Sequence, residues 1–112
     1  MADKTIYVKH PWSMLDLEHY DEFIDALRMQ IDKRHPLFRR EVFPIAVRRN
    51  PFAVIYETDD EPEIYALVYL GPIFPVAKRK RLVNPRTEML QGIRGVQIRI
   101  NRDHEQWNAQ FA

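Results

Sequence analysis

The first strong pattern in the chain is a helical repeat of apolar residues between positions 13 and 33. We expect Ser13, with Asp16 three residues later, to cap the N-terminus of this helix. The pair His35-Pro36 should end it, because a residue before proline avoids the helical region. Spacings of three and four place the apolar residues on one face of an amphipathic helix: Leu17, Tyr20, Phe23, Ile24, Leu27 and Ile31.

Three segments after this helix have the composition of strands. Val42–Arg48 contains Pro44, which predicts an edge strand or a bulge. Ala53–Thr58 and Ile64–Leu70 are rich in β-branched and aromatic residues and are separated by an acidic turn, so they predict a β-hairpin. Both strands are apolar on both faces, and we therefore expect this hairpin to form the centre of the sheet.

The two ends of the chain have weaker signals. A short first strand is expected at Thr5–Lys9. Asn84 and Gly92 have the residue types that begin and end a short helix, with a proline at its first position. Val96–Ile100 alternates apolar and polar residues, as a strand does, and Asp103 would start a last short helix.

These elements predict a single α+β domain over residues 1–112, in the order β-α-β-β-β-α-β-α. Its antiparallel sheet would have a central hairpin at about 53–70. One long N-terminal helix at about 13–33 and two short C-terminal helices would pack to one side of it.

Charge is segregated along the chain although the net charge is only +1. Residues 13–32 and 57–63 are acidic, whereas residues 33–51 and 76–102 are basic. Blocks of this kind either neutralise each other across the fold or create local fields that attract a charged partner.

The residue types needed for most small-molecule chemistry are missing or poorly placed. The chain has no cysteine and three glycines, none of them in a phosphate-binding loop. Its one serine is better explained as a helix cap, and no two of its histidines have metal-ligand spacing. We therefore expect no cofactor and no metal, and binding of another macromolecule in place of small-molecule catalysis.

The same composition bears on location. The first ten residues lack the apolar stretch of a signal peptide, and no apolar run reaches the roughly 18 residues of a membrane span. A protein of the cytoplasm that does not contact the membrane is expected.

Two groups of charged residues are candidates for binding a partner. Four adjacent cations repel each other, so they are either solvated or meet an anionic partner: Lys78, Arg79, Lys80 and Arg81. Arg48 and Arg49 would contribute to the same basic face. On the predicted helix, Asp21, Glu22 and Asp25 fall on the outer face, where they would meet solvent or a basic partner.

The stretch His35–Leu70 resembles the central part of the RelE/ParE toxin superfamily. Arg48–Tyr56 matches the paired arginines and following strand of that family, and Ile64–Leu70 matches its apolar last strand. The resemblance covers about a third of the chain and implies a basic face that acts on RNA or on a protein target. It also implies counterparts of the residues with which RelE-type members cleave mRNA: Arg48, Arg49, Arg81 and Tyr56.

Two classes of function follow. In the first, the chain is a RelE/ParE-like domain of a toxin–antitoxin system, whose partner is a cognate antitoxin, a protein target or RNA. In the second, it is a non-enzymatic inhibitor, such as an immunity protein or a phage-encoded antagonist, that blocks a partner such as a nuclease toxin. The acidic blocks favour the inhibitor and the basic run favours the toxin; a structural or assembly protein is a third alternative.

Overall fold

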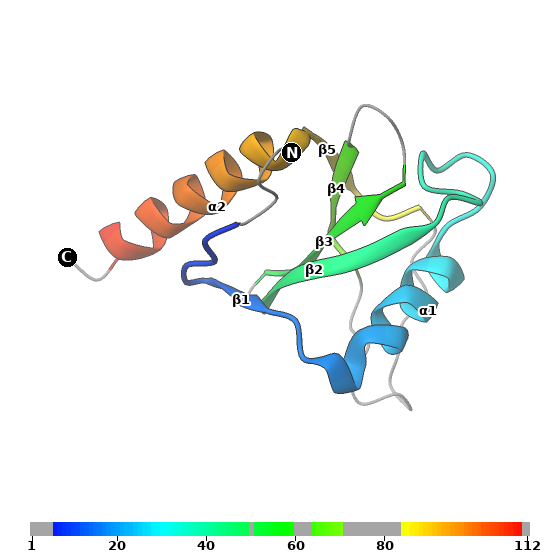
Figure 1. Ribbon diagram of the computed structural model, residues 1–112, viewed down its shortest axis with the longest axis horizontal. Helices are drawn as coiled ribbons and strands as arrows, with labels where there is room; N and C mark the ends of the chain where they lie inside the picture. Colours follow the sequence, from blue (N-terminus) through cyan, green and yellow to red (C-terminus); the bar gives the residue numbers. More distant parts are fainter. Residues whose placement is uncertain (1–5, 50, 60–63, 71–83, 111–112) are drawn as a thin grey trace.

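The computed structural model describes residues 6–49, 51–59, 64–70 and 84–110. They form a five-stranded antiparallel sheet in the order β1-β2-β3-β4-β5, with a helix on each face (Figure 1). The elements are β1 (Trp12–Met14), the 3-10 helix η1 (Leu17–His19), α1 (Tyr20–Gln30), β2 (Val42–Arg49), β3 (Phe52–Thr58), β4 (Ile64–Val68), β5 (Thr87–Gln91) and α2 (Gly92–Ala109).

The predicted hairpin is present at the centre of the sheet. Strand β3 lies between β2 and β4, and Val54 pairs with Val68 across the hairpin. Residues on both faces of these strands are completely buried, as their apolar composition requires. The predictions of an antiparallel sheet and of a central hairpin are therefore confirmed.

The prediction for the proline-containing strand is also confirmed. Pro44 pairs with Tyr56, but Ala46 already pairs with Ile55, so Ile45 is the extra residue of a bulge. Strand β1 pairs only with the segment of β2 after this bulge. Among the described residues, the first half of β2 therefore has no strand on its outer side, which is where a proline is tolerated.

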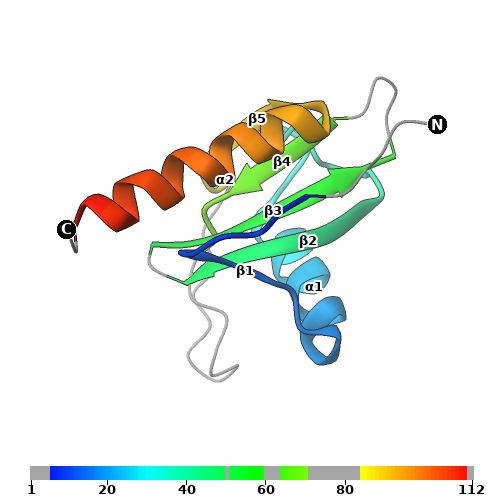
Figure 2. The ribbon, with the colours of Figure 1, turned by 60° about the vertical axis from the view of Figure 1, so that its left-hand side comes forward.

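The two helices cover opposite faces of the sheet (Figure 2). The first core includes Phe23 and Leu27 of α1, and the second includes Val96 and Ile100 of α2. The prediction that all helices pack to one side is wrong. A sheet whose central strands are apolar on both faces needs cover on both, and α2 covers the face opposite α1.

The long helix expected at 13–33 is shorter and starts later. Ser13 lies in β1 instead of capping a helix, and its hydroxyl donates a long hydrogen bond of 3.4 Å to the carbonyl of Val47. Asp16 is the cap, since its side chain accepts the backbone N–H of Glu18. Residues 12–14 extend the sheet because their backbone groups can pair with β2. The described part of the expected strand at Thr5–Lys9, residues 6–9, has no regular secondary structure.

Of the three elements predicted after residue 83, the short helix and the strand are wrong, and the last helix is part of a longer one. Residues expected to form a short helix between Asn84 and Gly92 form strand β5 instead. The strand expected at Val96–Ile100 and the helix expected after it are one helix, α2. Its buried residues recur every three or four positions, as on the inner face of a helix: Val96, Arg99, Ile100 and Asp103. The strand prediction placed Ile98 on the inner face, but its side chain is 60% exposed. Alternation of apolar and polar residues therefore does not determine the conformation of this segment.

Candidate functional site

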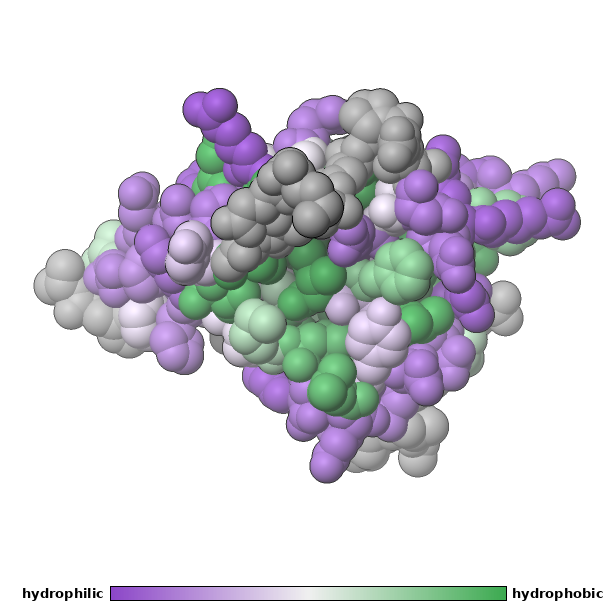
Figure 3. All heavy atoms as spheres, in the orientation of Figure 1, coloured by the Kyte–Doolittle hydropathy of each residue, from purple (hydrophilic) through white to green (hydrophobic). Residues whose placement is uncertain are grey.

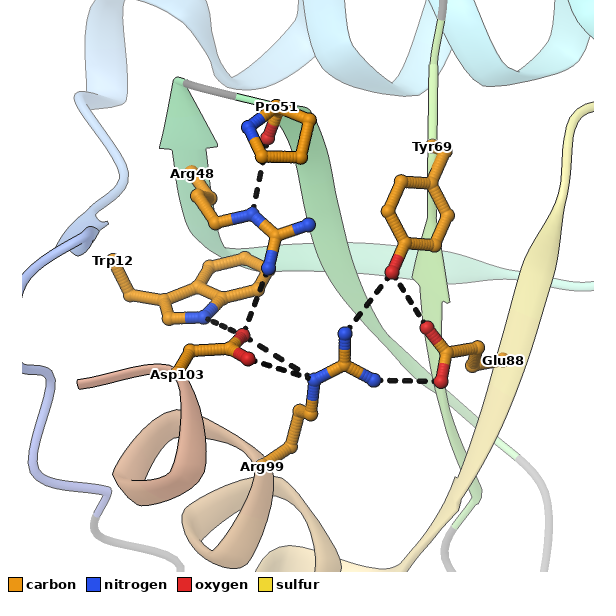
Figure 4. Close-up of polar contacts among 7 residues, drawn as sticks. All are labelled: Trp12, Arg48, Pro51, Tyr69, Glu88, Arg99 and Asp103. Carbon is orange, nitrogen blue, oxygen red and sulfur yellow. Dashed lines mark hydrogen bonds and ion pairs between the residues drawn. The ribbon is translucent and has the colours of Figure 1, made fainter. Parts of the chain in front are cut away.

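A buried polar network joins α2 to the sheet (Figure 4). Its centre is the Asp103 carboxylate of α2, which accepts hydrogen bonds from Trp12 Nε1 and Arg48 Nη1, both at 2.8 Å. The Nε of Arg99, one turn earlier on the same helix, lies 3.2 Å from both oxygens of this carboxylate. One acidic group from α2 therefore binds β1, β2 and its own helix at once.

The network continues from Arg99 to strand β5. The Nη1 of Arg99 lies 2.6 Å from a Glu88 oxygen, and its Nη2 donates to the Tyr69 hydroxyl at 3.0 Å. Tyr69 donates to the other Glu88 oxygen at 2.7 Å. Burial alone raises the pKa of Glu88, but the hydrogen bonds from Tyr69 and Arg99 outweigh it and leave this pKa below its ordinary value.

Arg48, predicted to contact a partner, is instead part of the interior. It is 5% exposed, and its Nε donates to the carbonyl of Pro51 at 3.0 Å. Its guanidinium lies 5.1 Å from the ring of Trp12 and 5.5 Å from that of Tyr69. With a carboxylate and two rings around it, Arg48 holds the network together and does not present a charge to a partner.

The residues that the family resemblance assigned to mRNA cleavage do not assemble in the described part of the chain. Tyr56 is fully buried on the α1 side of the sheet, and its hydroxyl donates to the carbonyl of Phe23 at 2.7 Å. Burial raises the pKa of Tyr56. Arg48 lies on the other side of the sheet, beside α2, and Arg81 lies outside the described residues. In the network itself, two arginines balance two carboxylates, and the hydrogen bonds between them hold α2 against the sheet.

Two of the three acidic residues predicted on the outer face of α1 are exposed there. Asp21 and Asp25 are exposed, and within the described part of the chain neither forms an ion pair. Glu22 is half-buried, with an oxygen 3.5 Å from Nδ1 of His19. Burial raises the pKa of Tyr20, and the charges of Asp21 and of Glu57 on β3 add to this effect. Asp21 and Asp25 therefore give this side of α1 an exposed negative charge that forms no ion pair within the described residues.

The predicted basic face is only partly described. Lys78, Arg79, Lys80 and Arg81 lie outside the described residues. Arg49 is exposed at the end of β2, where it lines a pocket of about 230 Å³ with Asp16, His19 and other residues. Side-chain ligand atoms of Asp16, Glu18 and His19 lie within 4.8 Å of one another. The two carboxylates are exposed, and exposed acidic groups of this kind are common without a metal ion, so we propose no metal site here.

A groove that the sequence did not predict lies beside the C-terminal end of α1. It has a volume of about 600 Å³ and an apolar floor that includes Leu27, Leu37 and Val42, all buried. Its rim is charged: Arg28, Arg39, Arg40, Glu41 and Asp59. The rim carries three arginines and two carboxylates, so its net charge favours an acidic group over a basic one. We call this feature the α1–β2 groove.

The wall of the α1–β2 groove is a tight loop held by buried groups. Nδ1 of His35 accepts the backbone N–H of Leu37 at 3.1 Å, so the ring proton is on Nε2, 2.7 Å from the Thr87 hydroxyl. Burial lowers the pKa of His35, and the neutral form is the one that fits this network. Arg39, two residues beyond Leu37, has a φ of 63° and lies over the ring of Phe38.

Asn84 attaches this region to the second half of the chain. Its backbone N–H donates to the carbonyl of Gln30 at 2.6 Å, which satisfies a carbonyl at the end of α1. Its side chain exchanges hydrogen bonds with Asp32, at 3.0 and 2.8 Å. The hydrogen bonds from Arg34, with that from Asn84, hold the pKa of Asp32 well below its ordinary value.

No family model, no characterised protein and no solved structure matched the chain. Neither helix in the described part of the chain is long and apolar enough to cross a membrane.

Proposed function

We propose that this chain is a non-catalytic protein that binds and inhibits another protein, and that it uses the acidic surface of α1 to do so. The observation that carries this proposal is the exposure of Asp21 and Asp25, which have no ion-pair partner within the described residues. Exposed charges of one sign on a rigid helix speed association with a partner of opposite sign and select against other partners. A basic partner protein, such as a nuclease, is the expected target.

The second candidate is the toxin-type function implied by the resemblance to the RelE/ParE superfamily. It is supported by the exposure of Arg49 and by the basic sequence of residues 78–81. The burial of Arg48 and Tyr56 favours the inhibitor, because an RNA-cleaving site would need these groups at a surface. We therefore rank binding of a protein above cleavage of RNA.

The test of the first candidate is a double charge reversal, Asp21→Lys with Asp25→Lys. Tagged wild-type and variant chains would be used to capture proteins from lysate of the native host, and the captured partner would be quantified. We expect at least about tenfold less partner with the variant, because two charges that face the partner change sign. Glu22 stays unchanged because it lies beside His19.

The matched control places the same change in net charge on the far end of α2. It combines Glu105→Lys, Asn108→Lys and Gln110→Lys, all at exposed positions. Equal capture by wild type, variant and control would refute the acidic surface as the binding site. Expression in the host separates the two classes: a toxin arrests growth, whereas an inhibitor does not.

A further inference from the structure

Leu17 is exposed although the sequence places it in the apolar series of a helix. It is 85% exposed, more than any other large hydrophobic residue in the described part of the chain. It lies in η1, whose 3-10 geometry takes it out of line with the buried face of α1. Met14, three residues earlier, is 69% exposed. An isolated exposed leucine needs no explanation, but two large apolar side chains three residues apart in the sequence, both largely exposed, do.

The residues on either side of Leu17 in the sequence are acidic. Asp16 and Glu18 flank it and are exposed. Figure 3 shows hydrophobic side chains gathered in the middle of the face that includes β1 and η1, bordered by hydrophilic ones. We call Met14, Asp16, Leu17 and Glu18 together the η1 knob. A surface of this kind fits an apolar hollow with a positive rim.

The α1–β2 groove has an apolar floor and one more arginine than carboxylate on its rim, and it is on the same chain. Its floor is apolar, and the exposed side chains of Arg28 and Arg39 lie on its rim. We propose that the α1–β2 groove of one molecule receives the η1 knob of a second copy of this chain. Leu17 enters above the apolar floor, while Glu18 meets the arginines of the rim. This inference does not rest on the inhibitor function proposed above.

The positions of knob and groove determine the form of the assembly. The knob precedes the N-terminal end of α1 and the groove lies beside its C-terminal end, at opposite ends of one rigid helix (Figure 1). A molecule therefore cannot fill its own groove with its own knob. The contact joins two different surfaces, so it is head-to-tail and each molecule keeps one knob or one groove open for a further copy.

The test uses two pairs of substitutions in the full chain. The groove variant carries Arg28→Glu and Arg39→Glu, and the knob variant carries Leu17→Ser and Glu18→Lys. Sedimentation velocity over a wide dilution series, at low and high ionic strength, measures self-association. We expect concentration-dependent association of the wild type that weakens in salt, and a loss of at least about tenfold in each variant.

Each variant has a control with the same change in charge and a similar loss of apolar surface on α2. For the groove it is Arg94→Glu with Arg102→Glu, and for the knob it is Ile98→Ser with Glu105→Lys, all at exposed positions. The controls should associate as the wild type does. Circular dichroism melting shows whether each variant is folded.

Mixing the two variants is the decisive experiment. The knob variant keeps an intact groove and the groove variant keeps an intact knob, so together they should form a one-to-one complex that neither forms alone. A wild type that is monomeric at every concentration would overturn the proposal, even if a foreign acidic peptide bound in the groove. Unchanged association of both variants, or a mixture that stays monomeric, would overturn it as well.

Discussion

Replacing Asp103 by alanine should be among the most destabilising single substitutions in this chain. The carboxylate is 6% exposed and is the only carboxylate that contacts Arg48 in the described residues. Arg99 would keep Glu88 and Tyr69 after the substitution. Arg48 would keep only the carbonyl of Pro51 and its two rings, so a buried cation would lose its counter-ion.

The size of the effect follows from this burial. Removing one partner of a buried ion pair costs about 3–5 kcal/mol, because the remaining charge is left without solvent or partner. In a domain of this length, that corresponds to a fall of about 12–20 °C in the melting temperature. Removing both charges is much less costly, since the buried charge disappears with its partner. The double variant Arg48→Met with Asp103→Leu should therefore be more stable than Asp103→Ala.

The assay is urea unfolding followed by circular dichroism, with Glu105→Ala as an exposed control on the same helix. The control should stay within about 0.5 kcal/mol of the wild type. Our account of the network would be refuted if Asp103→Ala lost less than about 1 kcal/mol. It would also be refuted if the double variant were less stable than the single one.

Three further predictions address pH, hydrogen bonding and charge. Burial lowers the pKa of His35 below its ordinary value of 6.5, so the contribution of neutral His35 to the free energy of unfolding is fully present above pH 6.5 and is lost as the pH falls below it. Between pH 7 and pH 5, urea unfolding should therefore show a smaller loss of stability in His35→Asn, which keeps an acceptor for the N–H of Leu37, than in the wild type. Tyr56→Phe removes a buried hydrogen bond to Phe23 and should cost about 1–2 kcal/mol in thermal unfolding; RNA cleavage that depended on this hydroxyl would contradict its structural role. Glutamine at all four positions of Lys78–Arg81 should weaken RNA binding most at low salt, because fewer counterions are released; a wild type with no salt-dependent binding to RNA or to an acidic protein would disprove a role for this run.

The parts of the fold that the sequence predicts correctly depend on short-range preferences. Strands β3 and β4 are continuous runs of β-branched and aromatic residues around a turn, and such runs have few alternatives. Pro44 has no backbone N–H to donate to a neighbouring strand, and this predicts a break such as the bulge in the hydrogen-bond ladder of β2. The outward position of Asp21 and Asp25 follows from helical periodicity.

The incorrect predictions concern segments whose patterns suit two conformations. Val96–Ile100 alternates like a strand, yet Val96 and Ile100 are also four residues apart, as on one face of a helix. The choice depends on the neighbours that the segment meets in the folded chain. In α2 this spacing places Val96 and Ile100 in the core. The same spacing places Arg99 and Asp103 on the inner face, where they join the polar network.

The sequence alone therefore determines an antiparallel sheet with a central hairpin and segregated charge, because these follow from local composition. Only the tertiary structure decides which charges stay outside. Arg48 and Arg49 are adjacent in the sequence, but Arg48 is buried because Asp103, 55 positions later, meets it. The α1–β2 groove likewise needs α1, the following loop and the ends of β2 and β3 in one place. Burial and concavity result from contacts between residues distant in the sequence, and local preferences do not contain them.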